Sequence, residues 1–359
     1  MAAPKLTPGT LYVLRDRDFR TGEWGKYVKI GVVQNEREVE KRDKEHQTGN
    51  PREVCMIHSY ETPMVVNLET RLHHTYANLR ISGEWFEMDD DFVKNVLCPT
   101  IENMITEYEE HVQPFTSRDE LKNVASNGTT RAATKQEIEL HERYNELKEI
   151  SDRLGAQAAI LKAKLFELIG NNGGAEGIVS LQISTNAEST PLDKKGLFQT
   201  HPDLVEPFVH VKMGNPSGKL LIQGTSSLNE VDEELDGKKK VAAKAIKGIE
   251  PTQAECTLLS RTDEMMRLHE QYLSLLGPIF STDLEMDGIK ARLAAAIGDF
   301  EAIEGVVEWK REAKESTSFD KKGFAEAHPL EYEAFLGHTP ESKSVSFMVS
   351  MKRSYPIEH

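Results

Sequence analysis

The stretch TLYVLRDRDFRTGEWGKYVKIGVV, residues 10–33, decides the fold of the N-terminal part of the chain. It contains two runs rich in apolar and β-branched residues, TLYVLR at 10–15 and KYVKIGVV at 26–33, which predict two strands. The segment between them, DFRTGEWG at 18–25, is polar and contains glycine, as hairpin connections do. We therefore predict a β-hairpin close to the start of the chain.

The hairpin is followed by further periodic segments. Asn35 with Glu38 three residues later is typical of a helix start, and Gly49-Asn50-Pro51 predicts its end. The acidic run Asp89-Asp90-Asp91 suits the first turn of another helix. The predicted elements after the hairpin are a helix at 35–48, a strand at 53–61, a helix at 64–79, a strand at 84–88 and a helix from 89 to 112. The order ββαβαβα predicts a small α+β domain over residues 1–112.

The rest of the chain contains an internal repeat. LHERY at 140–144 returns as LHEQY at 268–272, and LKAKL at 161–165 returns as IKARL at 289–293, both offset by 128. DKKG at 193–196 returns as DKKG at 320–323, offset by 127. Each copy is expected to contain a long helix, a strand, a short helix near His-Pro and a closing strand. We predict two tandem helix-plus-strand modules at 136–223 and 256–359, with linkers at 113–135 and 224–255.

Composition limits the classes of function. Charged residues make up 29% of the chain and hydrophobic residues 38%, which is typical of a globular protein. No apolar run has the length of a signal peptide or of a transmembrane helix, so we expect a cytoplasmic protein without a membrane partner. The three cysteines have no zinc-site spacing and are expected to be free thiols.

The net charge of −15 is unevenly distributed along the chain. Residues 1–100 contain 14 Lys and Arg against 16 Asp and Glu, while the remaining 259 residues contain 30 against 43. Phosphate binding is therefore expected near the front, and the acidic rear suits a protein partner or self-association. The basic cluster around 238–247 is interpreted as a solvated helix face.

Several residues in the first domain suit phosphodiester chemistry. Arg42 and His46 are four residues apart and would project from one helix face, where Arg42 could bind phosphate and His46 could exchange a proton. Glu69 lies within an apolar stripe, which is costly for a carboxylate unless it has a partner such as a metal ion. Tyr12 and Lys29 lie on adjacent predicted strands, where the lysine would lower the pKa of the tyrosine.

The ordered series TLYVL, YVKIG, an arginine helix, NLETRLHHTY and GEWFE resembles the GIY-YIG endonuclease superfamily, closest to the phage and fungal branch with KIG and GEWF. The resemblance covers about residues 9–95. It implies that Tyr12 orients or deprotonates a water, that Arg42 contacts the scissile phosphate and that His46 carries a proton. It also implies that Glu69 binds one divalent metal ion, Mg²⁺ or Mn²⁺. Gly31, Trp85 and Phe86 belong to the motifs, and we expect both aromatic side chains in the core.

Two positions depart from the superfamily pattern. Thr10 stands where the first motif has glycine, and Lys29 stands where the second has tyrosine. A late asparagine is also common in the superfamily, and both Asn78 and Asn95 are candidates. His73, one turn after Glu69, could extend the site.

The repeats are similar to the C-terminal tail of YqaJ-type phage recombination exonucleases, on the Lys-bearing helix, Ile-Gly, GVVEWK and DKKG…HP. This resemblance implies a phage setting, and hence the cytoplasm of a bacterial host. Two functions are consistent with the sequence. One is a metal-dependent DNA endonuclease whose acidic modules dock a protein partner or a second copy. The other is a catalytically inactive DNA- or protein-binding adaptor or counter-defence protein. RNA or branched DNA stays open as a substrate, because no base-reading motif is visible.

Overall fold

Residues 10–33 form the expected hairpin in the computed structural model, which describes residues 4–34, 47 and 51–356. The hairpin belongs to an antiparallel sheet of order β3-β1-β2-β5-β4. Its strands are β1 (Gly9–Arg17), β2 (Trp24–Gln34), β3 (Glu53–Thr62), β4 (Arg80–Ser82) and β5 (Trp85–Glu87). The strands predicted at 53–61 and 84–88 are confirmed, and the short β4 was not predicted.

Both faces of this sheet are covered. Leu11 and Val13 belong to the large core on one face, whereas Tyr12 and Leu14 belong to a smaller cluster on the other face with Val54. This alternation follows from the period of two along a strand. The central strand β1 is therefore buried on both sides, and Tyr12 lies on the face opposite the large core.

Helices follow the sheet at the expected places. They are α2 (Val65–Thr75), α3 (Asp90–Phe92), the π-helical turn η1 (Val93–Leu97) and α4 (Cys98–Leu121). Asp89 caps α3 by accepting a hydrogen bond from the Phe92 N–H at 2.8 Å. The helix expected to end at 112 continues to Leu121, because Phe115 packs into the core beyond that point. Part of the segment 113–135, expected as a linker, is therefore helical.

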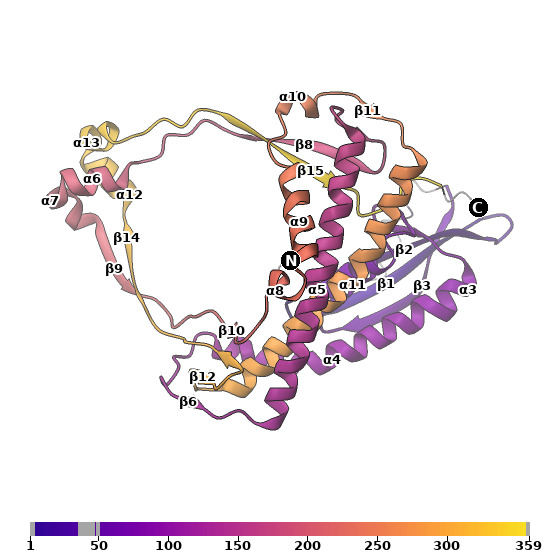
Figure 1. Ribbon diagram of the computed structural model, residues 1–359, viewed down its shortest axis with the longest axis horizontal. Helices are drawn as coiled ribbons and strands as arrows, with labels where there is room; N and C mark the ends of the chain where they lie inside the picture. Colours follow the sequence, from indigo (N-terminus) through magenta and orange to yellow (C-terminus); the bar gives the residue numbers. More distant parts are fainter. Residues whose placement is uncertain (1–3, 35–46, 48–50, 357–359) are drawn as a thin grey trace.

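The two repeats contribute one long helix each, α5 (Lys135–Ile169) and α11 (Asp263–Ile297), which pack side by side (Figure 1). Equivalent residues make reciprocal contacts across this pair. The Lys162 ammonium lies 5.4 Å from the Tyr272 ring centroid, and the Lys290 ammonium lies 5.5 Å from that of Tyr144. Because each lysine packs on the tyrosine of the other copy, the helices are related by an approximate two-fold axis.

The two repeat copies also contain corresponding strands. The first copy contains β7 (Gly174–Ala175), β8 (Val179–Asn186), β9 (Val209–Met213) and β10 (Leu221–Ile222). The second contains β12 (Ala302–Ile303), β13 (Val307–Glu308), β14 (Glu315–Phe319) and β15 (Ser342–Val349). The short strands β6 (Thr130–Arg131) and β11 (Leu258–Leu259) pair with β12 and β7.

Strands pair between the copies. β8 pairs with β15, so that Val179 lies opposite Val349, and β13 pairs with β10, so that Val307 lies opposite Ile222. β9 pairs with β14 as well. The copies therefore fold as one intertwined body, in which the segments predicted as modules, 136–223 and 256–359, supply strands to each other's sheets. Sequence similarity between copies does not tell which copy supplies the neighbouring strand.

A small lobe lies at the far end of the paired strands (Figure 1). It contains α6 (Lys194–Thr200), α7 (Pro202–Val205), the turn η2 (Glu206–Phe208), α12 (Lys321–Ala327) and α13 (Pro329–Ala334). Leu197, Val205 and Phe324 form its core. The lobe is joined to the body by the ribbons β8–β15 and β9–β14.

Helix α11 also completes the core of the first domain. Phe280, Leu284 and Ala291 of α11 belong to the same cluster as the residues of α2 and α4. Gly277 allows this approach, because a Cβ there would lie 2.9 Å from the Thr75 Cα at the end of α2. The first domain and the repeats therefore share one core.

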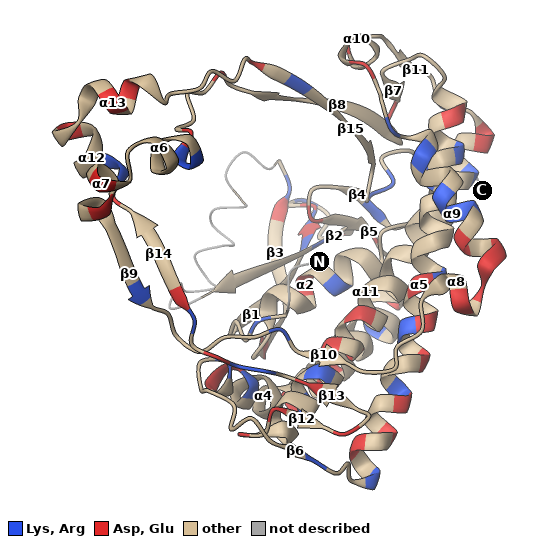
Figure 2. Ribbon diagram, turned by 60° about the vertical axis from the view of Figure 1, so that its left-hand side comes forward, with Lys and Arg blue, Asp and Glu red and all other residues tan. Residues whose placement is uncertain are grey.

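Residues 224–255, expected as a linker, contain helices α8 (Leu228–Val231), α9 (Glu233–Ala245) and α10 (Pro251–Ala254). The basic cluster lies on α9, where Lys238 pairs with Glu234 and Lys240 with Asp236. Positively and negatively charged residues both occur along α5 and α9, coloured blue and red in Figure 2. This supports the interpretation of a solvated helix face. Within the described part of the chain, no helix combines the length and hydrophobicity needed to cross a membrane.

Candidate active site

The hairpin places three of the predicted site residues on one face of the sheet. Tyr12 lies opposite Gly31, and Leu14 lies opposite Lys29, in the pairing of β1 with β2. The Tyr12 ring lies over Gly31, where a Cβ would be only 2.5 Å from the tyrosine hydroxyl oxygen. The glycine of the KIG motif is therefore needed for the position of the tyrosine.

The turn between β4 and β5 brings an additional acid to this face. Gly83 has a φ of 53°, a conformation that favours glycine, and the next residue is Glu84. The Glu84 carbonyl accepts a hydrogen bond from the Ile30 N–H at 3.0 Å, which fixes the turn against β2. The Glu84 carboxylate forms an ion pair with the buried Lys29.

Glu69 is placed by the packing of its own helix. Its neighbours Leu68 and Leu72 are fully buried in the large core, so α2 packs on the face of the sheet opposite Tyr12. The Glu69 side chain is half-buried, and its carboxylate forms no hydrogen bond or ion pair with a described residue. Burial, and then the charge of Glu84, raises the pKa of this carboxyl to about 7.

Two cations oppose this shift. The charges of Lys29 and Arg80 lower the pKa of Glu69, so both lie within electrostatic range of its carboxylate. Glu69, Lys29, Glu84 and Arg80 therefore form one charged group at the edge of β2, contributed by α2, β2 and the β4–β5 turn. Glu84 belongs to the GEWF motif, but neither Glu84 nor Arg80 is predicted as a site residue from the sequence.

The group fits a single divalent cation. A half-buried carboxylate without a partner is unfavourable unless a cation compensates it. Carboxylate oxygens are the ligands that Mg²⁺ and Mn²⁺ prefer. Among residues 4–34, 47 and 51–356, no group of three or more His, Cys, Asp or Glu side chains could hold a metal ion together. The cation would thus have Glu69 as its main protein ligand, with Glu84 held by Lys29.

His73 has a structural contact. Its Nε2 lies 3.1 Å from the Ile30 carbonyl oxygen, to which it donates, and its ring lies 5.4 Å from that of Phe86. Burial, and then the charge of Arg80, lowers the pKa of His73 to about 4, so the ring is neutral. His73 therefore fastens α2 to β2, and does not extend the site as a proton carrier.

The remaining motif residues divide between core and surface. Phe86 is fully buried, as expected, whereas Trp85 is half-buried next to Lys29 on the paired strands. Asn95 is exposed on the π-helical turn. Asn78 follows α2, and its carboxamide oxygen is buried without a partner among the described residues.

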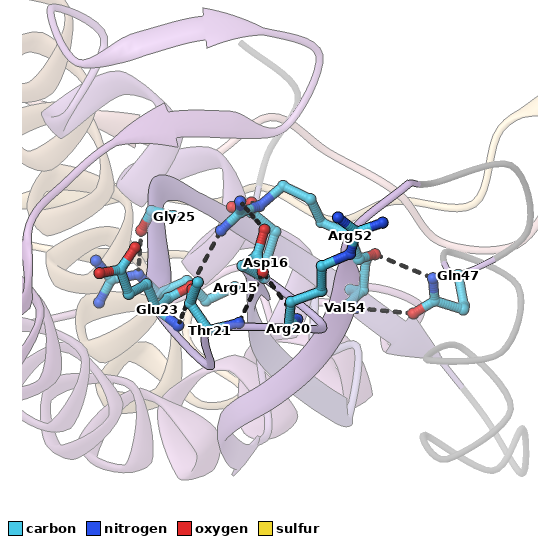
Figure 3. A network of polar contacts seen from close by, with 10 residues as sticks. Arg15, Asp16, Arg20, Thr21, Glu23, Gly25, Gln47, Arg52 and Val54 are labelled. Carbon is cyan, nitrogen blue, oxygen red and sulfur yellow. Dashed lines mark hydrogen bonds and ion pairs between the residues drawn. The ribbon is translucent and has the colours of Figure 1, made fainter.

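The predicted residues Arg42 and His46 lie outside the described residues. The next described residue, Gln47, is attached to the sheet (Figure 3). Its amide donates to the Arg52 carbonyl at 3.0 Å and accepts from the Val54 N–H at 2.8 Å. These bonds fasten Gln47 to the start of β3.

A second polar network holds the hairpin loop (Figure 3). Asp16 forms an ion pair with Arg52, and the Arg15 Nε donates to the Gly25 carbonyl at 2.7 Å. Asp18 accepts from the backbone N–H groups of Arg20 and Thr21 at 2.8 and 2.9 Å. Arg15 and Arg52 are therefore bound to groups of the protein itself and are not placed to bind a substrate.

Comparison with known proteins agrees with the N-terminal part of this description. Residues 9–98 match the T5orf172 domain, a GIY-YIG-related domain family. No curated protein and no solved structure matches the chain. The match ends before the repeats, and nothing in these comparisons supports their similarity to the YqaJ-type tail.

Proposed function

We propose that this protein is a metal-dependent DNA endonuclease that hydrolyses phosphodiester bonds at the group around Glu69. The observation that carries the proposal is the half-buried Glu69 carboxylate, which has no partner among the described residues and lies within electrostatic range of Lys29 and Arg80. The match of residues 9–98 to a GIY-YIG-related domain supports the same chemistry.

Each residue has a separate task in this proposal. Glu69 would hold Mg²⁺ or Mn²⁺, which would supply a Lewis acid that offsets negative charge on the reacting phosphate. Tyr12 orients the attacking water and accepts its proton, and Lys29 supplies a positive charge on the same face, as the family resemblance implies. Glu84 positions Lys29 through their ion pair.

Arg42 and His46 complete the proposed set. The Arg42 guanidinium binds the scissile phosphate, because its fork of donors matches phosphate oxygens. His46 exchanges a proton with the leaving oxygen. Both roles are taken from the family resemblance.

The test is cleavage of supercoiled plasmid by the full chain. We expect nicking with Mg²⁺ or Mn²⁺, no nicking with EDTA, and loss of nicking in Glu69→Gln. Glu120→Gln, an exposed glutamate of α4, is the matched control and should cleave as the parent does. Circular dichroism establishes that the inactive variant is folded, and Mg²⁺ should raise the melting temperature of the parent but not of Glu69→Gln.

The alternative is an inactive DNA- or protein-binding adaptor. The acidic character of the repeats favours it, since residues 101–359 contain 43 Asp and Glu against 30 Lys and Arg. In either function we propose that the repeats dock a protein partner or a second copy. Val211 and Met213, 63% and 57% exposed on β9, offer an apolar contact for it. Binding of DNA or of a host protein, without cleavage under any divalent ion, would favour the adaptor.

A further inference from the structure

A cavity of about 450 Å³ lies between the β4–β5 turn and the repeat sheet of order β11-β7-β8-β15. Arg80 and Gly83 line it from the first domain, Gln182 lines it from β8, and Lys352 lines it from the segment after β15. Its volume is within the range of about 300–1,000 Å³ that small-molecule sites occupy. It is therefore large enough for one nucleotide.

The segment after β15 joins the first domain to the repeat sheet on the two sides of the cavity. The Arg353 N–H donates to the Arg80 carbonyl at 2.7 Å, and the Ser354 hydroxyl donates to the Ile81 carbonyl at 3.3 Å. The Ser350 N–H donates to the Ile178 carbonyl at 2.8 Å on the repeat side. Two of these three bonds join backbone groups, so the segment after β15 holds the two sides of the cavity together.

The two cations of this cavity differ from those of the hairpin. Arg15, Arg17 and Arg52 are paired with carboxylates. Arg80 and Lys352 form no ion pair with a described carboxylate, and the Arg80 Nε donates to the Gly83 carbonyl at 2.6 Å. They are therefore free to bind an anion such as a phosphate.

The cavity also offers an apolar wall. Leu258, Met348 and Met351 line it, and their side chains are 52%, 42% and 46% exposed. Apolar side chains beside two free cations suit a ligand with both an anionic group and a flat or apolar part, as a nucleotide has.

The cavity and the candidate active site share Arg80. Gly83 lines the cavity and Glu84 follows it directly, and the charges of Glu69 and Glu84 act on Arg80. Arg80 therefore lies between the Glu69 group and the other residues that line the cavity.

A second cavity, of about 460 Å³, lies between α4 and the long helices but does not suit a phosphate. It contains three arginines, and each is paired with a glutamate: Arg71 with Glu107, Arg143 with Glu285 and Arg292 with Glu110. An anion there would have to displace a carboxylate.

We propose that the cavity between the β4–β5 turn and the repeat sheet binds the nucleotide that flanks the scissile phosphate of a DNA substrate. Arg80 and Lys352 bind its phosphate, and the apolar wall packs on its sugar and base. Naming DNA as the ligand rests on the proposed function. The repeats thereby contribute directly to substrate binding.

The first test measures DNA binding apart from cleavage. A fluorescein-labelled duplex is titrated with full-length Glu69→Gln protein, with and without Lys352→Ala, at several salt concentrations. Loss of Lys352 should raise the Kd about tenfold and lower the salt dependence by about one released ion. Lys343→Ala, an exposed lysine of β15 outside the cavity, is the matched control and should leave the Kd unchanged.

A second test fills the cavity without removing charge. Gln182→Trp introduces a bulky side chain at an exposed lining position, and Ser184→Trp places the same side chain two residues further along β8, outside the cavity. Only Gln182→Trp should weaken DNA binding. Unchanged Kd and salt dependence in both Lys352→Ala and Gln182→Trp would overturn the proposal.

Two further outcomes distinguish the assignment of the cavity from the proposed nuclease function. If deoxynucleoside monophosphate binds the parent as tightly as the duplex does, the cavity belongs to a free nucleotide and the assignment to a substrate strand is wrong. If the parent cleaves no plasmid but its DNA binding depends on Lys352 and Gln182, the nuclease function fails while the cavity assignment holds.

Discussion

Glu69 carries the acid–base behaviour of the candidate site. Burial and Glu84 raise the pKa of its carboxyl from 4.5 to about 7. Within this window the folded protein holds a proton that the unfolded chain releases, so stability falls as pH rises and levels off above the raised pKa. We therefore expect this carboxyl to lower the melting temperature of the cation-free protein as the pH rises from 4.5 to about 7. Differential scanning fluorimetry across this pH range measures the decrease.

Glu69→Gln isolates the contribution of that one carboxyl. The variant cannot release the proton, so the difference in melting temperature between variant and parent should grow as pH rises. Mg²⁺ should remove part of the difference by compensating the parent's carboxylate. A constant difference at all pH values would contradict the raised pKa.

Gly31 controls the position of the proposed catalytic tyrosine. In Gly31→Ala the new Cβ would lie 2.5 Å from the Tyr12 hydroxyl oxygen, and because Tyr12 is 2% exposed the ring has little room to move. We expect a loss of about 1–3 kcal/mol in stability from this overpacking. The rate of plasmid cleavage should fall even at temperatures where the variant is folded, because the displaced phenol no longer contacts the attacking water.

Gly155→Ala is the matched control for that substitution. Gly155 lies in α5, and a Cβ there meets nothing within 4 Å. Alanine is the better helix former by up to about 1 kcal/mol, so this variant should be as stable as the parent or more so. Equal cleavage by Gly31→Ala and the parent would show that Tyr12 needs no such placement.

At the scale of elements, α11 supports the helix that carries Glu69. Gly277 of α11 approaches the last residue of α2, and a Cβ would lie 2.9 Å from the Thr75 Cα. Since backbone cannot rotate away as a side chain does, Gly277→Ala should separate the helices and cost about 1–3 kcal/mol. Chemical denaturation measures this loss.

The same substitution elsewhere should have the opposite sign. Gly237 lies in α9 with nothing within 4 Å of its hypothetical Cβ, so Gly237→Ala should stabilise the protein slightly. Stabilisation by Gly277→Ala as well would contradict the close contact of α11 with α2.

At the scale of the whole molecule, the shared core predicts cooperative unfolding. Residues of α11 complete the core of the first domain, and the repeat copies exchange strands. Neither the first domain nor the body of the repeats can therefore lose its structure without exposing apolar surface of the other. We expect one calorimetric transition for the full chain.

Tryptophan fluorescence gives the local measurement. Trp24 and Trp85 lie in the first domain, and Trp309 is buried in the repeats. A Trp24→Phe/Trp85→Phe variant reports the repeats, and Trp309→Phe reports the first domain. Each variant's fluorescence midpoint should coincide with its own calorimetric transition. A second transition seen by one reporter alone would mean that the parts unfold independently.

Much of the local structure could be predicted from the chain itself. The hairpin, the helix around Glu69, the cap at Asp89 and the two long repeat helices follow from periodicity and from residues adjacent in sequence. Of the site, Tyr12, Lys29 and Gly31 share a face as their strand positions imply. Arg42 and His46 remain predictions, since they lie outside the described residues.

The tertiary structure alone decided which helices, strands and side chains lie against one another. That α11 completes the first core, that β8 pairs with β15, and that Glu84 and Arg80 lie beside Glu69 could not be derived from periodicity. Periodicity shows that a helix or strand has an apolar face but does not tell which of several similar faces will cover it. Local elements were therefore determined by the sequence alone, because neighbours in the chain suffice to form them. The shared core and the charged group at its edge were decided only when distant faces packed together.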